Sequence, residues 1–155
     1  MKRITDWVHD GLRRQVCAGD WVLDATLGNG HDASLLVDCV GPAGHVFGVD
    51  IQQQAVDTTS ARLKGASQFH GICGNHARLA SLLPEDCRGK LTAAVFNLGY
   101  LPGASRGQIT AVDSTLAAVN SALDWLAPGG VLSCTCYPGH EEGALEAQAV
   151  ERWFQ

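Results

Sequence analysis

The sequence has few charged and aromatic residues and no long apolar segment. Charged residues make up 17% of its 155 residues and the formal net charge is −5, which argues against binding nucleic acid through a large basic surface. The first 20 residues carry charges throughout, so they lack the apolar centre of a secretion signal, and no apolar run approaches membrane-spanning length. These absences predict a cytoplasmic protein without a membrane partner.

The six cysteines and six histidines lack the spacings of metal sites. No C-x-x-C or H-x-x-x-H pair occurs, so we predict neither a metal site nor a disulfide framework. Cys73, Cys134 and Cys136 fall in apolar runs that resemble buried strands. We therefore expect small, buried free thiols in a reducing compartment.

What the sequence does contain is an alternation of strand-like and helix-like segments within one domain, residues 1–155. Strands are expected at 20–26, 45–50, 67–74, 91–98 and 131–139, and helices at 4–15, 31–39, 53–63, 76–83, 110–126 and 141–154. Short apolar strands that are each followed by a helix predict an α/β fold, with a parallel sheet covered on both faces.

Polar clusters follow every expected strand: "GNGHD", "DIQ", "GNH", "NLGYLPG" and "YPGHEEG". The carboxyl ends of parallel strands meet at one edge of the sheet, where such folds bind their ligands. The sequence therefore predicts an active site at this edge.

The first of these loops fits the G-x-G-x-x-G/A fingerprint of adenosine cofactors, with Gly28, Gly30 and Ala33. Asp50 ends the second strand, where an acid binds the ribose hydroxyls of such cofactors. Each feature also has a purely structural explanation, a tight strand–helix turn for the glycines and a helix cap for Asp50. Together they favour an adenosine cofactor, either NAD or S-adenosylmethionine (SAM).

Three features favour SAM over NAD. The carboxylate of Asp24 would repel a pyrophosphate and attract the ammonium of a methionine moiety. A chain of 155 residues leaves little room for a second mononucleotide-binding half. The segment "NLGYLPG" offers an amide and an aromatic ring that could bind an amine and stack on a base.

The motifs "LDATLGNGHD", "GVDIQQQAVDTT", "NLGYLPG", "TLAAVNSALDWLAPGG" and "YPGHEEG" resemble, in order and spacing, the YtqB-like rRNA methylase family. The resemblance covers essentially the whole chain. It implies a Rossmann-like class I methyltransferase with strand order 3-2-1-4-5, SAM as cofactor, and an RNA substrate. Family members methylate the aminomethyl group of modified uridine at the tRNA wobble position, so the tRNA anticodon loop is the expected partner.

The resemblance also implies roles for individual residues. Cofactor contacts are expected from Asp24, Thr26, Gly28, Asn29, Gly30, Asp32, Asp50, Gln52, His76, Asn97 and Leu98. Asn97, Tyr100, Tyr137 and His140 are expected to be catalytic. Methyl transfer would be a direct in-line displacement in which Asn97 orients the amine. His140 or Tyr137 would accept a proton, directly or through water, unless the amine binds already neutral.

Several alternatives stay open at this stage. The chain could methylate rRNA or a small molecule, or bind SAM without catalysis. His31 could be functional or a solvent-facing first-turn residue, and "HEEG" could simply begin the last helix. Class I methyltransferases normally end with an antiparallel hairpin, and this chain stops at "ERWFQ". Two alternatives follow: the chain is a truncated product, whose activity is then in doubt, or a partner subunit, as in a homodimer, covers the fifth strand.

Overall fold

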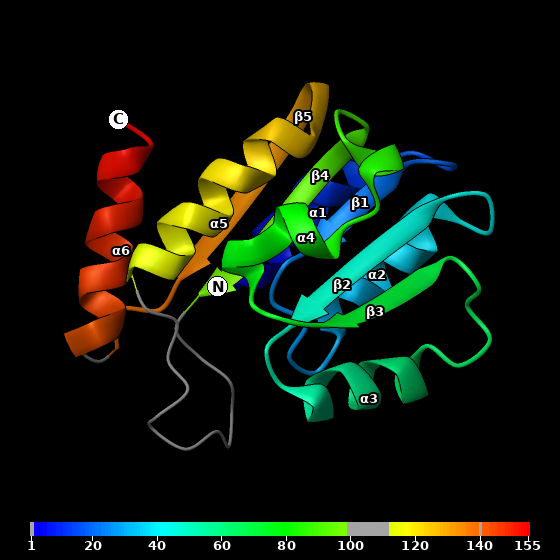
Figure 1. Cartoon of the computed structure of the whole chain (residues 1–155), viewed down its shortest axis with the longest axis horizontal. Coiled ribbons are helices and arrows are strands. Elements are labelled where there is room, and N and C mark those ends of the chain that lie inside the picture. Colours follow the sequence, from blue (N-terminus) through cyan, green and yellow to red (C-terminus); the bar gives the residue numbers. More distant parts are fainter. Residues whose placement is uncertain (1, 99–111, 140) are drawn as a thin grey trace.

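The structure is a computed structural model that describes residues 2–98, 112–139 and 141–155. Strands and helices alternate along the chain (Figure 1). The strands are β1 (Trp21–Asp24), β2 (His45–Asp50), β3 (Phe69–Cys73), β4 (Leu91–Leu98) and β5 (Leu126–Cys136). The helices are α1 (Ile4–Gln15), α2 (His31–Val40), α3 (Gln53–Arg62), α4 (Leu79–Leu82), α5 (Val112–Trp125) and α6 (Glu141–Trp153), with short 3₁₀ turns η1 (His76–Arg78) and η2 (Glu85–Cys87).

The five strands form one parallel sheet in the order β3-β2-β1-β4-β5. The predicted fold class and strand order are therefore confirmed. β1 lies between β2 and β4, so the direction of winding reverses beside it. In open parallel sheets, this reversal is where the loops separate and a ligand can enter.

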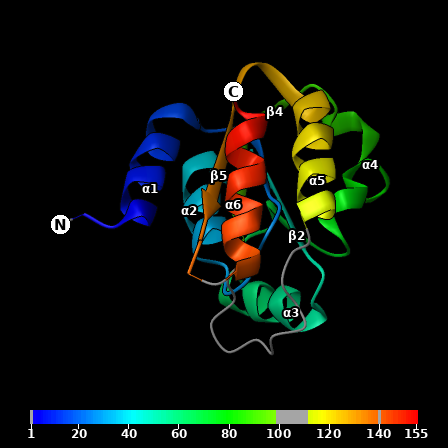
Figure 2. The same cartoon turned by 90° about the vertical axis from the view of Figure 1, so that its left-hand side faces the viewer.

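Side chains alternate between the two faces of the sheet, as a period of two requires. Val22 of β1 packs in a cluster with α1 and α2, whereas its neighbour Leu23 packs in a cluster with α4 and α5. The helices accordingly lie on both faces of the sheet, with α1 and α2 on one side and α4 and α5 on the other (Figure 2).

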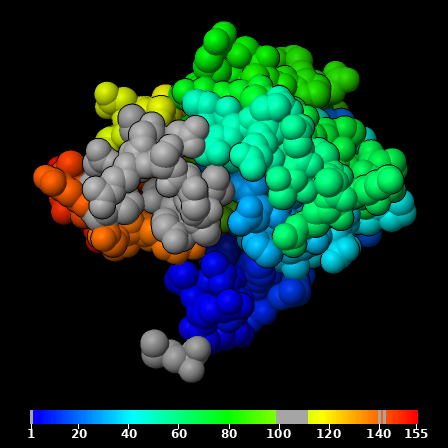
Figure 3. Space-filling view, turned by 90° about the horizontal axis from the view of Figure 1, so that it is seen from below, coloured from blue at the N-terminus to red at the C-terminus, as the bar shows by residue number. Residues whose placement is uncertain are grey.

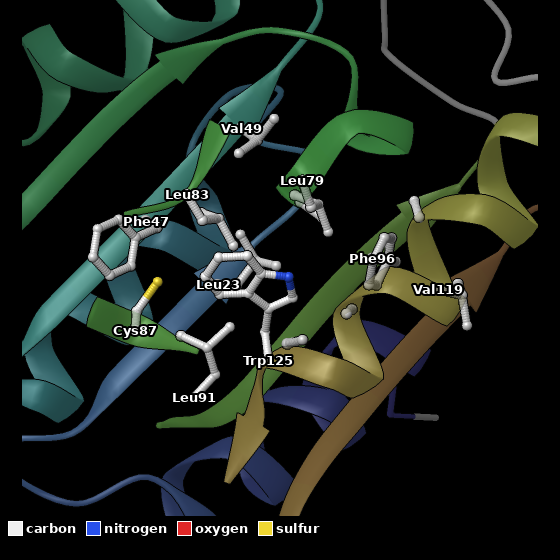
Figure 4. Close-up of a cluster of buried hydrophobic side chains, with 14 of the residues drawn as sticks. Leu23, Phe47, Val49, Leu79, Leu83, Cys87, Leu91, Phe96, Val119 and Trp125 are labelled. Atoms are coloured by element: carbon white, nitrogen blue, oxygen red, sulfur yellow. The ribbon is translucent and has the colours of Figure 1, made fainter. Parts of the chain in front are cut away.

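The larger cluster is centred on aromatic side chains between the sheet and α5. Trp125 at the end of α5 and Phe96 of β4 are both fully buried there, together with Leu23 and Leu91 (Figure 4). Fully burying side chains of this size stabilises a fold by about 2 kcal/mol each. This packing fixes β4 against α5 and thereby positions the end of β4.

The two edge strands differ from expectation. Each half-buries its side chains because only one neighbouring strand is paired with it among the described residues. Cys73 is consequently exposed, and Cys134 and Cys136 are only partly buried, so the expectation of buried thiols is wrong for all three. All six cysteines are free, and Cys87 is the buried one.

Most predicted element bounds agree with the structure within two residues, and β5 differs more. Its pairing begins at Leu126, directly after α5, and an irregularity containing Gly129 precedes regular pairing from Val131. The predicted start of the helix at residue 110 lies outside the described residues.

In the described part of the chain, no helix is both long and apolar enough to cross a membrane. The missing C-terminal hairpin stays a prediction.

Candidate functional site

The segments that follow β1, β2 and β5 lie together on the face where the strands end (Figure 3). The loop after β1 lies between the other two because β1 is central in the sheet. Helix α1 also reaches this face. The predicted convergence is therefore seen for these three segments, and residues 99–103 of "NLGYLPG" and His140 of "YPGHEEG" lie outside the described residues.

Two glycines shape the loop after β1. Gly28 and Gly30 have φ angles of 50° and 75°, in the left-handed region that favours glycine. The hydroxyl of Thr59 on α3 donates to the carbonyl oxygen of Gly28 over 3.4 Å. A Cβ atom on Gly30 would lie 2.6 Å from Oγ1 of the same threonine. Thr59, which the sequence reasoning did not single out, thus sets how closely α3 approaches this loop.

We expect Gly30→Ala to lower the free energy of unfolding by about 3 kcal/mol or more, because it combines left-handed strain with the contact to Thr59. Gly19→Ala is the matched control, since Gly19 has a φ angle of 88° but open space around its Cβ position. Its cost should be about 1–2 kcal/mol. Urea denaturation of both variants measures the difference, and equal losses would contradict the proposed contact.

Asp24, the last residue of β1, is completely buried beneath this loop. Its Oδ1 accepts a hydrogen bond of 3.1 Å from the main-chain N–H of Thr26. Its Oδ2 is buried and has no partner with hydrogen-bond geometry, although the main-chain N–H of Ala33 acts on this carboxyl and slightly lowers its pKa. Burial raises the pKa of Asp24 to about 8, and the nearby charges of Asp32 and Asp50 contribute in the same direction. A cationic group that reached this oxygen would give Oδ2 a partner and would lower the pKa of Asp24 again.

Asp50, the last residue of β2, also forms hydrogen bonds that hold the loop after β1. Its Oδ2 accepts from the N–H of Gly28 and its Oδ1 from the N–H of Gln52, both over 2.9 Å. Gln52 is the residue that caps α3. Each carboxylate oxygen can accept a further hydrogen bond, so these contacts leave acceptor capacity for ribose hydroxyls.

Asn97, near the end of β4, forms hydrogen bonds through both its main chain and its side chain. Its main-chain N–H donates to Oγ1 of Thr26 over 2.7 Å, and its Nδ2 donates to Oδ2 of Asp32. Leu98, the next residue, is fully buried. The bond to Thr26 joins the end of β4 to the loop after β1, which brings the expected cofactor and substrate sides together.

Asp32 in the first turn of α2 has a second partner that sequence reasoning missed. Its Oδ1 lies 2.5 Å from Nε2 of His9 on α1. The available signal was helical spacing, because His9 shares a helix face with Leu12, which is buried. A polar side chain on a buried helix face usually has a partner.

Tyr137 follows β5 and is half-buried. Burial, and then the negative charge of Asp32, raise the pKa of its phenol. A raised pKa keeps the hydroxyl protonated at neutral pH. Tyr137 is therefore a neutral hydrogen-bonding group and a poor proton acceptor.

The remaining predicted residues differ in how far they are buried. The ring of His76 is buried, with Nδ1 3.3 Å from the carbonyl oxygen of Ala25, and burial lowers its pKa. His31 and Asn29 are exposed, and Nδ1 of His31 lies 3.5 Å from a guanidinium nitrogen of Arg62. The contact of His76 with adenine stays a prediction.

Tyr100 and His140 lie outside the described residues, so their predicted roles stay predictions. The described part of the chain contains no group of three or more His, Cys, Asp or Glu side chains placed to hold a metal ion.

Comparisons with known proteins find an rRNA methylase family and similar methyltransferases. A family model described as "Putative rRNA methylase" matches residues 46–155. The chloroplastic tRNA (mnm5s2U34)-methyltransferase of Arabidopsis thaliana is 36% identical over 163 residues, covering 97% of this chain. The chain spans 58% of the length of that relative.

Solved structures of high similarity include one described as a "putative rRNA-methylase" from Clostridium thermocellum. It is 32% identical with a TM-score of 0.91, over 99% of this chain and 82% of that one. A "putative methyltransferase" from Streptococcus mutans in complex with SAH is 32% identical with a TM-score of 0.86, over the same shares of the two chains. By the family match and these structures, the chain belongs to the rRNA methylase family of Rossmann-like methyltransferases.

Proposed function

We propose that the protein is a SAM-dependent methyltransferase that methylates the aminomethyl group of a modified uridine at the wobble position of tRNA. One observation supports this most strongly. A buried carboxylate oxygen of Asp24 lacks a partner directly beneath a glycine loop at the sheet edge. Such an oxygen suits a cationic ligand group, and the methionine end of SAM carries an ammonium.

The residues present fit SAM at both of its ends. Asp24, Gly28, Asn29 and Gly30 would hold the methionine end, with Thr26 and Asp32 beside them. At the other end, the spare acceptor capacity of Asp50 suits ribose hydroxyls, next to Gln52 and His76. When bound, SAM supplies an electrophilic methyl group on a sulfonium.

The chain's own residues would bind and orient the amine. The amide nitrogen of Asn97 is committed to Asp32, so its carbonyl oxygen is the group left for an amine N–H. Tyr137 stays neutral, and its hydroxyl oxygen would accept a second N–H of the amine, which leaves the nitrogen lone pair free to attack the methyl group. We propose that this pair sets the direction of the nitrogen lone pair, which is the main catalytic task in an in-line transfer.

The similar proteins support the tRNA substrate. The Arabidopsis relative is named for methylation of a modified U34 in tRNA, and the Streptococcus neighbour was solved with SAH. By this likeness the partner is RNA, and we propose the anticodon loop as the contact region. Assembly as a homodimer and a cytoplasmic location stay predictions.

The test uses the full chain, SAM and bulk tRNA from a bacterial strain that lacks its own wobble aminomethyl methyltransferase. We expect nucleoside mass spectrometry to show conversion of aminomethyl-uridine to methylaminomethyl-uridine. Ribosomal RNA from the same strain is the control and should gain no methyl group. Methylation of rRNA alone would overturn the substrate, and absence of SAM binding in calorimetry would overturn the enzyme class.

A further inference from the structure

Three side chains from distant parts of the sequence form a continuous chain of contacts next to the site. His9 on α1 lies with Nε2 2.5 Å from Oδ1 of Asp32 on α2, and Oδ2 of Asp32 accepts from Nδ2 of Asn97 on β4. The side chains of His9 and Asp32 are 22% and 12% exposed, so water screens this contact only partly. Each oxygen of the carboxylate thus has its own partner.

This arrangement fixes the amide of Asn97. Its main-chain N–H is already bonded to Thr26, so the residue cannot shift along the strand without losing that bond. If the amide flipped, its carbonyl oxygen would face the carboxylate of Asp32, and two acceptors would be opposed. The carboxylate therefore holds the carbonyl oxygen of Asn97 on the side away from Asp32.

The orientation of the Asn97 amide depends on Asp32, because Asp32 accepts its hydrogen bond. The charge of Asp32 acts on Asp24, whose pKa it helps to raise, and on Tyr137. The N–H of His9 is the contact that anchors Oδ1 of Asp32 among these groups. Without it, Asp32 could rotate about its own side-chain bonds and release the amide.

Resting on the proposed function, we propose that His9 is a positioning residue for methyl transfer. It holds Asp32, and Asp32 holds the amide of Asn97 with its carbonyl oxygen toward the amine of the substrate. Helix α1 then has a role in the reaction beyond covering the sheet, although no motif of the family resemblance includes it.

The experiment compares His9→Leu with His9→Gln, whose side-chain amide can still donate to Asp32. Arg14→Leu, an exposed position on the same helix, is the matched control. In His9→Leu, we expect kcat to fall about tenfold to 100-fold while the Kd for SAM changes less than threefold. His9→Gln should recover most of the loss, and Arg14→Leu should keep the kcat of the parent protein.

A second readout does not depend on activity. The side-chain N–H signals of Asn97 in a ¹⁵N-labelled sample, assigned by their loss in Asn97→Asp, should shift toward values of a weaker hydrogen bond in His9→Leu but not in His9→Gln. Unchanged signals with unchanged kcat in His9→Leu would overturn the proposal. An equal loss of kcat in His9→Gln, at an unchanged melting temperature, would also overturn it.

The two proposals fail in different ways. If the parent protein methylates no tRNA, the proposed function is wrong, and the Asn97 signals still decide whether His9 holds the amide through Asp32. If the parent protein is active and the signals and kcat are insensitive to His9→Leu, the proposed function stands and the role of His9 does not.

Discussion

Asp24→Asn is expected to weaken SAM binding at least about 100-fold. We also expect this variant, without ligand, to be more stable than the parent protein at pH 8. Binding weakens because the unpaired Oδ2 of Asp24 is the group that would meet the cofactor's ammonium, and an amide carries no charge. Removing one partner of a buried, charged hydrogen bond typically costs about 3–5 kcal/mol. This corresponds to a factor of 100 or more in Kd.

The gain in stability follows from the pKa of Asp24. This pKa rises from 3.8 to about 8 on folding, so between these two pH values the unfolded chain has released a proton that the folded protein still holds. The free energy of unfolding of the parent protein therefore falls by about 1.4 kcal/mol per pH unit over this interval, as far as Asp24 contributes. The stabilisation that comes from the proton on folded Asp24 is fully present below pH 4 and is lost above pH 8.

The measurement is urea denaturation of the parent protein and Asp24→Asn at pH 5 and pH 8, beside calorimetry with SAM. The difference in unfolding free energy should favour the variant more strongly at pH 8 than at pH 5. Asp38→Asn, at an exposed position of α2, is the control and should change neither quantity. A variant that binds SAM like the parent protein would show that Asp24 does not meet the ammonium.

Binding should also release a proton. A cation beside Asp24 favours the carboxylate form, so at pH 6.5 the protein that binds SAM should lose up to about one proton. Calorimetric titrations in two buffers with different ionisation enthalpies measure this release. We expect it to be absent in Asp24→Asn.

Asn97→Asp is expected to lower kcat by about 100-fold or more. The substitution keeps the size of the side chain, but it replaces the N–H that donates to Asp32 with a second carboxylate oxygen. Two opposed carboxylates would repel each other and turn the side chain away from the amine. Misplacing a positioning group by about 1 Å can cost two orders of magnitude in rate.

Asn97→Ala separates the two parts of this effect. It removes the oxygen that orients the amine without adding a charge, so we expect a smaller loss of kcat, about tenfold to 100-fold. Single-turnover methylation of tRNA measures both variants, with Asn120→Ala on α5 as the control. Asn120 bonds Leu116 and Trp153, away from the end of β4. A normal kcat in Asn97→Asp would contradict the proposed role of the amide.

Much of the fold could be predicted because its signals are local. Apolar runs of strand length alternate with helical periodicity, and Gly28, Gly30 and Asp50 stand at the fixed offsets of a strand–loop–helix unit. The helix bounds at 4–15 and the strand bounds at 45–50 and 91–98 agree with the structure for this reason. Edge strands were harder to predict, since the apolar content of Cys73 and its neighbours does not say whether a second strand lies beside them.

By itself, the sequence determined the alternation of elements, the edge at which polar loops meet, and the glycine loop with Asp24 beneath it. Each follows from spacing within a short segment, where backbone period and turn chemistry leave few choices. Only the tertiary structure decided that Oδ2 of Asp24 is left without a partner, and that Asp32 joins His9 to Asn97. These contacts connect residues 23 and 65 positions apart, and such pairs are set by how helices and strands pack, which no local pattern encodes.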